Sequence, residues 1–362
     1  MKNILISGAS IGGPALAYWL RRYGFNVTVV ERYRGIRPGG QAIDVRGPAL
    51  EVIERTGLGD QLRSFSTNMR GMSMVDEDGN EVYRSTEHTL SGGDLSSPDV
   101  ELLRDDLARM IFDAVEGVEY LFDDTITSID GNLVTFEKSA PRSFDVIVGA
   151  DGLHSNVRRL AFGPESQFIS HLGMNLAVFT APNWLELDHW QTFQQSGDVG
   201  GGIMSARANA ECRVYMGFNG EVDYDHRDVE AQRRLIAEKF ADAGWVWQTA
   251  LKHMWEAPDF HFDAMAQIRM DSWSHGNVVL LGDAGYCGSP LSGQGTSMAL
   301  VGAYVLAGEL RDGFGTAFQR YEEILRPYVT ANQDMALKNQ ANGGAPTEEF
   351  AEVVNSLTLP RY

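Results

Sequence analysis

The apolar positions near the start of the chain predict two buried strands with a helix between them. Residues 4–6 are all apolar and are followed by Gly8, which is typical of a strand that ends in a tight turn. Apolar side chains then recur with the spacing of one helix face over residues 15–20. A second apolar run, residues 27–30, ends on the acid Glu31. Together these features predict a strand–helix–strand unit of about thirty residues.

Two later apolar runs extend this pattern. Residues 144–148 are followed by G-A-D-G, and residues 278–281 are followed by G-D-A-G. We expect both runs to be strands beside the first two in one sheet, so the domain that contains them is discontinuous. The boundaries that we predict for this dinucleotide-binding domain are residues 1–67, 99–165 and 274–312.

The pattern changes in the segments between these parts. Residues 69–75 and 81–84 flank D-E-D-G-N, a hairpin signal. Short runs with aromatic residues then alternate with Gly, Asn and Asp turns, which predicts an antiparallel sheet. We assign residues 68–98 and 166–273 to a second, substrate-binding domain and residues 313–362 to a C-terminal helical segment. The predicted fold class is therefore α/β, a Rossmann-like domain with a second antiparallel-sheet domain and C-terminal helices.

Two helix predictions depend on local detail. Apolar side chains within residues 99–115 recur on one face and predict a single helix over that whole segment. A second helical pattern covers residues 314–338, and Pro327 within it should kink or split the helix, because proline lacks the N–H that the helix needs.

Composition and charge restrict the partners. The 362 residues carry a net charge of −19, which disfavours nucleic acid and anionic membrane surfaces as partners. Two cysteines make no disulfide framework, and the eight histidines show no ligand spacing, so we expect no metal site. A strand that begins at residue 3 leaves no room for a signal peptide, and no apolar run reaches transmembrane length. We expect a cytoplasmic protein, monomeric or weakly homo-oligomeric.

The first turn has the chemistry of a dinucleotide site. Gly8 allows the tight turn, Gly13 allows close packing of helix on sheet, and the helix N-terminus offers N–H groups to a pyrophosphate. Glu31 is placed to accept hydrogen bonds from ribose hydroxyls. The usual second glycine is Ser10 here. Both NAD and FAD fit this unit.

Two further stretches distinguish between the cofactors. They are F-D-V-I-V-G-A-D-G-L-H-S-N-V-R-R at 144–159 and G-N-V-V-L-L-G-D-A-G-Y-C-G-S-P-L-S-G-Q-G-T-S-M-A-L at 276–300. With the arginine of E-L-L-R-D-D-L at 101–107, they resemble the single-component flavin monooxygenases, which include para-hydroxybenzoate hydroxylase. The likeness covers nearly the whole chain. The segment G-G-Q-A-I-D-V-R-G at 39–47 is most similar to the tetracycline-inactivating members.

The resemblance implies FAD as cofactor and a role for each matching residue. The fingerprint residues would hold the pyrophosphate, Glu31 the adenosine ribose, and Arg32 would lie by the adenine. Arg104 would contact the flavin chain and Arg46 would approach the flavin ring. The full set of implied cofactor-binding residues is Gly8, Ser10, Ile11, Gly13, Glu31, Arg32, Gln41, Asp44, Arg46, Arg104, Asp151, Gly282, Asp283, Pro290, Gly293, Gln294, Gly295 and Thr296.

The later motifs receive roles in the same way. Asp151 is similar to the residue placed between flavin and NADPH functions, Asp283 would hold the ribityl chain, and Pro290 would pack beside the isoalloxazine. The loop at 293–295 would meet the pyrimidine edge, where the N-terminus of the following helix stabilises negative charge. Two positions depart from the family pattern: Tyr286 replaces a common histidine, and Ser297 replaces a common asparagine.

The resemblance also implies the activity. We expect NADPH or NADH to reduce the flavin transiently and O2 to form a C4a-hydroperoxyflavin, which transfers one oxygen atom to a small aromatic or polyketide-like substrate. The flavin carries this chemistry, so no catalytic side chain is named. Residues that could line a substrate pocket are Tyr215, Met216, Phe218 and Pro290.

Three alternatives remain open on the sequence. A flavoprotein could sequester an aromatic ligand without turnover. A flavin-dependent halogenase shares the fold, and W-V-W at 245–247 partly matches its motif, but the I-P of that motif is absent and no lysine lies between Lys2 and Lys138. An NAD-dependent dehydrogenase would lack a bound yellow cofactor, and the later G-D and G-Q-G motifs argue against it.

Overall fold

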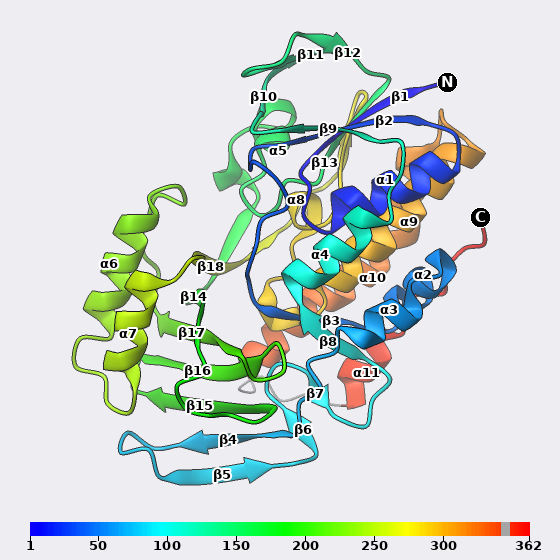
Figure 1. The fold of residues 1–362 in the computed structure, drawn as a ribbon. Coiled ribbons are helices and arrows are strands. Elements are labelled where there is room, and N and C mark those ends of the chain that lie inside the picture. The colour runs from blue at the N-terminus through cyan, green and yellow to red at the C-terminus, as the bar shows by residue number, and fades with distance from the viewer. Residues whose placement is uncertain (342–347) are drawn as a thin grey trace.

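The first sheet gathers strands that are far apart in the sequence. The computed structural model describes residues 1–341 and 348–362. Its six-stranded sheet has the order β19-β20-β13-β1-β2-β9, and all neighbours are parallel except β19 and β20 (Figure 1). The expectation that the runs at 144–148 and 278–281 join the first two strands is confirmed. The strands are β1 (Asn3–Ser7), β2 (Asn26–Glu31), β9 (Glu119–Phe122), β13 (Val146–Gly149), β19 (Ser274–His275) and β20 (Val278–Leu280).

Helices pack on this sheet around one central helix. Helix α9 (Gly295–Asp312) is buried continuously over residues 300–310 and contacts α1 (Gly12–Arg22), α2 (Pro48–Thr56) and α10 (Ala317–Ala341). A helix that is apolar on all sides belongs in the interior of a protein. The other helices of this part are α3 (Gly59–Ser64), α4 (Arg104–Asp113), α5 (Asn156–Ala161), α8 (Asp283–Tyr286) and α11 (Glu348–Val354), with 3-10 turns at Glu165–Gln167 and Pro290–Ser292.

The second sheet has seven strands in the order β18-β14-β17-β16-β15-β4-β5. All its neighbours are antiparallel except β4 and β15, which are parallel. The predicted hairpin is confirmed as β4 and β5. The strands are β4 (Gly71–Val75), β5 (Glu81–Ser85), β14 (Ile169–Pro182), β15 (Trp190–Ser196), β16 (Val199–Ala206), β17 (Glu211–Asn219) and β18 (His261–Ile268).

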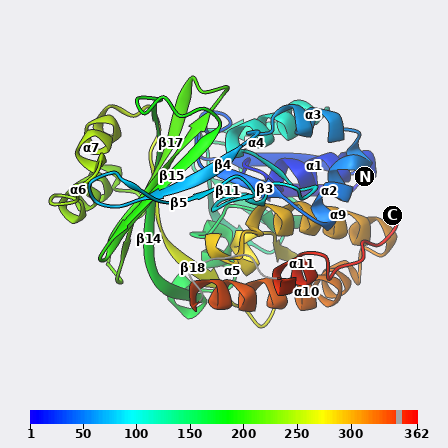
Figure 2. The ribbon, with the colours of Figure 1, turned by 90° about the horizontal axis from the view of Figure 1, so that it is seen from below.

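Protein covers both faces of this second sheet. Helices α6 (Val229–Lys239) and α7 (Trp247–Glu256) lie on one face. The helical part of the chain that surrounds the first sheet, including α1, α4 and α9, lies on the other face (Figure 2). Side chains alternate along a strand, so the two faces carry different residues. On β17, Val214, Met216 and Phe218 join the apolar core beneath α6 and α7. Arg213 and Tyr215 therefore face the helical part.

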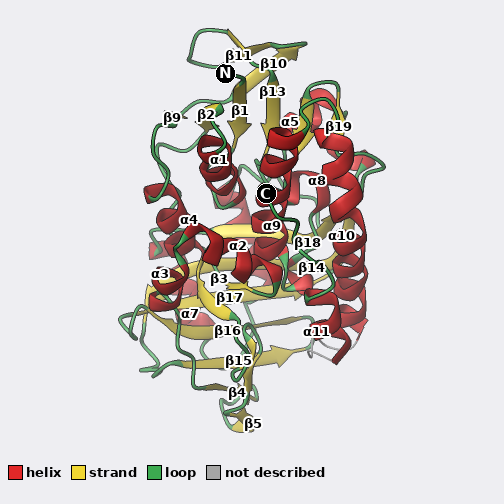
Figure 3. Ribbon diagram, turned by 90° about the vertical axis from the view of Figure 1, so that its right-hand side faces the viewer, coloured by secondary structure: helices red, strands yellow, loops and turns green. Residues whose placement is uncertain are grey.

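A two-stranded ribbon lies between the helices of the first part and the seven-stranded sheet (Figure 3). It pairs β3 (Ala42–Val45) with β8 (Val100–Leu103), antiparallel, and α4 begins directly after β8 at Arg104. The prediction of one helix over residues 99–115 is therefore wrong in its first turn. Leu102 and Leu103 fit a helical spacing, but this segment forms backbone hydrogen bonds with β3 and is therefore a strand.

The remaining strands are short: β6 (His88–Thr89), β7 (Gly93–Asp94), β10 (Ile126–Asp130), β11 (Leu133–Phe136) and β12 (Arg142–Ser143). Pro327 lies inside α10, which continues through it and is not split. Within the described residues, no helix combines the length and the apolar character that a membrane span needs. The predicted domain boundaries stay a prediction.

Candidate functional site

The turn after β1 can be made only with glycine at two positions. Gly8 has a φ of +108°, and a Cβ added there would lie 2.3 Å from the carbonyl oxygen of Ala150. A Cβ added at Gly13 would lie 1.9 Å from the carbonyl oxygen of Gly8. The first turn of α1 is thus pressed against the end of β1, and its N–H groups are left for a ligand.

Polar groups surround this turn. The Glu31 carboxylate accepts hydrogen bonds from the backbone N–H of Ala9 at 2.8 Å and of Tyr33 at 2.9 Å. The Ser10 hydroxyl, on an exposed residue, accepts one from Arg104 at 3.3 Å. Of the other predicted residues here, Ile11 is buried and Arg32 is exposed.

Arg104 connects the turn to the β3–β8 ribbon. Its guanidinium is buried and donates to the carbonyl oxygens of Arg37 and Gly39, both at 2.6 Å. Burial, and to a smaller extent the positive charge of Arg37, lower the pKa of Arg104 to about 10. Arg104 therefore stays protonated at neutral pH and brings a buried positive charge to the end of α1.

Asp151 lies at the opposite side of the same turn. Its carboxylate accepts hydrogen bonds from the hydroxyls of Ser7 at 3.2 Å and Ser155 at 2.5 Å, and from the N–H of Val157 at 3.1 Å. Burial raises the pKa of this carboxyl. These contacts fix the start of α5 against the end of β1.

The G-D and G-Q-G motifs meet at the N-terminus of α9. Asp283 is exposed between the buried Gly282 and Ala284, and a Cβ at Gly295 would lie 3.8 Å from its Oδ1. Pro290 is also exposed, while Gly293 is in the left-handed region at φ +61°. Gln294 is fully buried, yet both polar atoms of its amide lack a hydrogen-bond partner among the described residues. Thr296 follows in the first turn of α9 and is partly buried.

A buried polar amide without a partner is rare in proteins and indicates that a ligand or water completes it. An exposed carboxylate and a buried amide, unpartnered among the described residues, thus both lie at the N-terminus of α9. This arrangement fits the hydroxyl-bearing chain and the polar ring edge of a flavin, as the sequence resemblance implies.

Asp44 on β3 and Arg46, which directly follows this strand, lie close to the first turn of α9. The backbone N–H of Arg46 donates to the Ser297 hydroxyl at 3.1 Å, and its guanidinium pairs with Asp44 at 2.8 Å. It also donates to the carbonyl oxygen of Gly92 at 2.9 Å. The side-chain oxygen of Gln41, the residue before β3, is buried without a partner among the described residues.

The predicted substrate residues are separated by the strand alternation. Tyr215 faces the ribbon, and its hydroxyl accepts a hydrogen bond from the N–H of Ala42 at 2.9 Å. Met216 and Phe218 face the opposite way and are buried beneath α6 and α7. The prediction that Met216 and Phe218 line a pocket together with Tyr215 and Pro290 is therefore corrected. Met216 and Phe218 belong to the apolar core on the opposite face of the sheet.

The two departures from the family pattern have structural partners. Tyr286 is buried, and its hydroxyl lies 2.8 Å from the hydroxyl of Tyr321. A Cβ added at Gly302 would lie 2.2 Å from the Tyr286 hydroxyl. Ser297 supports the backbone of Arg46, as described above. Sequence reasoning missed two buried polar residues. Gln191 lies in no motif, and Glu101, on β8, begins the E-L-L-R-D-D-L stretch but was given no role.

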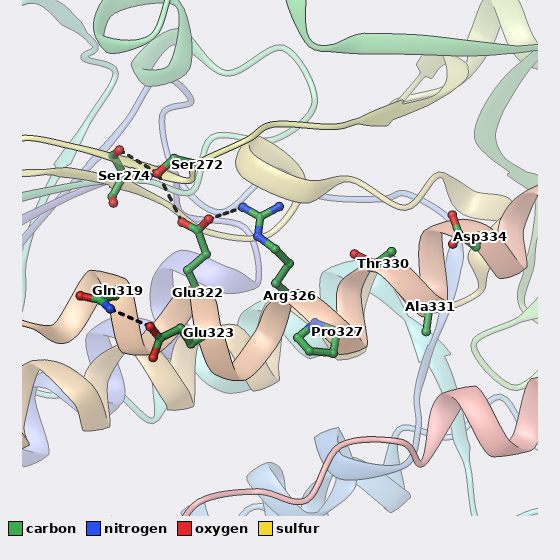
Figure 4. A pocket seen from close by; sticks show the side chains of 10 residues that line it. All are labelled: Ser272, Ser274, Gln319, Glu322, Glu323, Arg326, Pro327, Thr330, Ala331 and Asp334. Atoms are coloured by element: carbon green, nitrogen blue, oxygen red, sulfur yellow. Dashed lines mark hydrogen bonds and ion pairs between the residues drawn. The ribbon is translucent and has the colours of Figure 1, made fainter.

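A groove of about 850 Å³ lies elsewhere, along the outer side of α10 (Figure 4). None of the predicted site residues lines it. Two of its charged residues pair with each other, Glu322 and Arg326, and Glu322 also accepts the N–H of Trp273 at 3.0 Å. We therefore do not assign the site to this groove.

Comparisons with known proteins agree with this geometry. The profile of the FAD binding domain family matches residues 1–336. The uncharacterized protein Rv1260 of Mycobacterium tuberculosis (strain ATCC 25618 / H37Rv) is 52% identical over 372 residues, 100% of both chains. A flavin-dependent monooxygenase of Legionella longbeachae serogroup 1 (strain NSW150) is 36% identical over 99% of this chain and 98% of its own.

A solved structure agrees over its whole length. The crystal structure of tetracycline destructase Tet(51) has a TM-score of 0.90 and 33% sequence identity, and the match covers 100% of each chain. The family profile covers most of the chain, and the sequence identities of these relatives are higher than a shared fold alone would produce. This chain therefore belongs to the FAD binding domain family of flavin-dependent monooxygenases.

Proposed function

We propose that the protein uses NADPH or NADH and O2 to insert one oxygen atom into a small aromatic or polyketide-like molecule, with FAD as its cofactor. The observation that carries this proposal is the buried, unpartnered amide of Gln294 beside Asp283 at the N-terminus of α9. Bound FAD supplies the chemistry, which is uptake of a hydride from the nicotinamide and activation of O2.

The residues of this chain bind and orient that cofactor. The turn from Gly8 to Gly13, with Ser10 and Arg104, would hold the pyrophosphate, and Glu31 the adenosine ribose beside Ile11 and Arg32. Asp283 would hold the ribityl hydroxyls. The remaining predicted contacts are assigned to the ring and its edges: Gln41, Asp44, Arg46, Asp151, Gly282, Pro290, Gly293, Gln294, Gly295 and Thr296.

The substrate would lie between the flavin ring and the seven-stranded sheet. On that side of the sheet, Tyr215 contacts the β3–β8 ribbon through the N–H of Ala42. The name of the similar structure, tetracycline destructase Tet(51), supports a polycyclic polyketide as one substrate class.

The decisive experiment is nicotinamide oxidation by the purified, FAD-loaded protein, with mass spectrometry on phenols, aromatic polyketides and tetracyclines. We expect at least one compound to accelerate NADPH or NADH oxidation about tenfold and to gain the mass of one oxygen atom. A protein that binds such a compound, but never oxidises it with either reductant, would instead be a sequestering flavoprotein.

A matched pair of glutamine variants tests the assignment of the site. Gln294→Ala removes the buried amide, and we expect weaker FAD binding by about tenfold together with slower oxidation, because polar flavin atoms lose their partner. Gln319→Ala changes an exposed glutamine on α10, in the groove of Figure 4, and should alter neither. Equal behaviour of the two variants in an FAD titration would contradict the assignment.

A further inference from the structure

The turn between β13 and α5 carries a histidine that contacts two acids through both of its ring nitrogens. Nδ1 of His154 lies 2.9 Å from Oε1 of Glu165, and Nε2 lies 3.1 Å from Oδ1 of Asp263. Glu165 belongs to the 3-10 turn that follows α5, whereas Asp263 lies on β18 of the seven-stranded sheet. His154 therefore connects the part of the chain around the first sheet to the second sheet.

Both contacts of His154 are hydrogen bonds only when its ring is charged. A carboxylate accepts hydrogen bonds, and a neutral imidazole has a single N–H, so one of the two contacts would lack its proton in the neutral state. Burial alone would lower the pKa of His154, but the hydrogen bonds and charges of Asp263 and Glu165 outweigh burial and raise the pKa to about 9. The ring is therefore an imidazolium at neutral pH and loses a proton in mild alkali.

Six titratable or charged groups surround this ring: Glu165, Asp263, Arg158, Tyr224, His226 and His261. The ring of His226 stacks on His154 with the centroids 4.3 Å apart, and burial and the charge of His154 lower the pKa of His226. Burial, and next the charge of Arg37, lower the pKa of His261 to about 4. Among these neighbours, His154 is thus the histidine that holds the positive charge.

A buried arginine extends the contact toward the cofactor site. The side chain of Arg158 on α5 is fully buried, and its guanidinium pairs with Oε2 of Glu165 at 2.6 Å. The same guanidinium donates to the carbonyl oxygen of Ala284 at 2.8 Å. Ala284 directly follows Asp283, the carboxylate that we assign to the ribityl chain of FAD. The contacts thus run without a break from the seven-stranded sheet to the loop of Asp283.

We propose that His154 is a positioning residue, a pH-sensitive tie that in its charged form holds the seven-stranded sheet to the loop of Asp283 and so strengthens FAD binding. The inference rests on the proposed assignment of Asp283 to FAD. In alkali, solvent hydroxide takes one ring proton and becomes water, so the imidazole keeps one N–H and one of the two acids loses its donor. Two carboxylates then face a neutral ring, which favours separation of the sheet from the loop.

The sign of the pH dependence follows from a pKa that is raised in the folded protein. Such a group stabilises the closed tie fully below the ordinary histidine value of 6.5, and this stabilisation is lost as the pH rises through about 9. We therefore expect the tie to be closed in weak acid and near neutrality and to open in alkali.

A ring titration of the FAD-loaded protein is the first test, and it needs neither nicotinamide nor substrate. The eight histidines are labelled with carbon-13 at Cε1 and followed by NMR from about pH 6 to about pH 10.5. We expect one ring with a midpoint near pH 9, and its signal should be missing from His154→Gln. Glu165→Gln removes one of the two acids and should lower this midpoint by at least about one pH unit.

The second test measures how FAD affinity depends on the same proton. FAD is titrated into the apoprotein at about pH 6.5 and about pH 10, with fluorescence as the readout, and we expect about tenfold weaker binding at the higher pH. In His154→Arg, which stays charged at both pH values, the loss should shrink to the part that the flavin's own N3–H contributes. His154→Gln carries no charge and should bind FAD weakly at both pH values.

His189 supplies the matched control. Its ring also contacts a carboxylate, with Nδ1 2.9 Å from Oδ1 of Asp188, but this acid is 62% exposed and the pair lies in the connection between β14 and β15. Exposed ion pairs contribute little to stability. His189→Gln should therefore keep both the ring with a midpoint near pH 9 and the pH dependence of FAD affinity.

Two outcomes overturn the proposal. One is the absence of any ring with a midpoint above about pH 8 in the unchanged protein, and the other is an equal loss of FAD affinity in alkali for the unchanged protein and His154→Arg. Should His154→Gln fail to fold, these two measurements still decide the question. The proposed function fails separately, if the protein shows the alkaline titration but oxygenates no compound. Conversely, oxygenation by a protein that lacks this titration overturns only the role of His154.

Discussion

Gly13→Ala is expected to yield a protein that purifies without FAD. The new Cβ would lie 1.9 Å from the carbonyl oxygen of Gly8 and 3.1 Å from its carbonyl carbon. Both are backbone atoms, and Gly8 is itself held against Ala150, so neither can shift without opening the first turn of α1. We expect the FAD content per chain to fall at least about tenfold, because the N–H groups no longer converge on one phosphate.

The neighbouring glycine provides the control. A Cβ at Gly12 would lie 3.5 Å from a Leu281 methyl carbon and 3.6 Å from the Cβ of Ala299, which is ordinary contact. Gly12→Ala should therefore keep its FAD and fold with equal or greater stability, since alanine favours the helix. FAD content is measured from the absorbance of flavin released by heat, and circular dichroism shows whether each variant is folded. Full FAD content in Gly13→Ala would refute the proposed path of the pyrophosphate.

The sequence contained the information for the cofactor turn because that turn is local. Gly8, Gly13 and Glu31 lie within one strand–helix–strand unit, and their spacing along the chain fixes their spacing in space. The central helix after the G-Q-G motif was predictable for the same reason. Its length and its apolar residues on all sides predict a helix that is buried in the interior of the domain.

Features that depend on partners distant in the sequence were not predictable. Residues 99–103 fit a helix as well as a strand, and only the pairing of Val100 with Val45 decides between them. Met216 and Phe218 were read as possible pocket residues beside Tyr215. Both faces of β17 are covered by protein, so its sequence shows no clear alternation of polar and apolar positions that would separate them.

Two buried oxygen atoms, on Asp44 and Gln191, have no partner among the described residues and illustrate the same limit. Asp44 lies within a motif, but its free oxygen depends on Arg46 occupying the other one. Gln191 lies in no motif at all, and only the sheet brings it to Ser91. Polar contacts between the ribbon and the seven-stranded sheet therefore cannot be predicted from the sequence until the positions of both are known.

Arg104→Met is the second change for which we expect a large effect, a loss of FAD affinity of about a hundredfold. Arg104 is the buried cation next to the turn, and its guanidinium already contacts the Ser10 hydroxyl. Hydrogen bonds that involve a charged group contribute about 1.5–3 kcal/mol each, and methionine fills a similar volume without donating any. The carbonyl oxygens of Arg37 and Gly39 also lose their donor, so the melting temperature should fall as well.

The measurement is a fluorescence titration of FAD into the apoprotein, and the same helix supplies the control. Arg109 is exposed on α4 and stacks over Phe112 at 5.7 Å, so Arg109→Met removes an equal charge without touching the turn. If long-range attraction of the phosphates were the whole effect, the two variants would lose similar affinity, and the loss would shrink in high salt. We expect instead a large, salt-resistant loss in Arg104→Met alone. Arg104→Lys should be intermediate, because lysine restores the charge but cannot bond Gly39, Arg37 and Ser10 at once with one planar group.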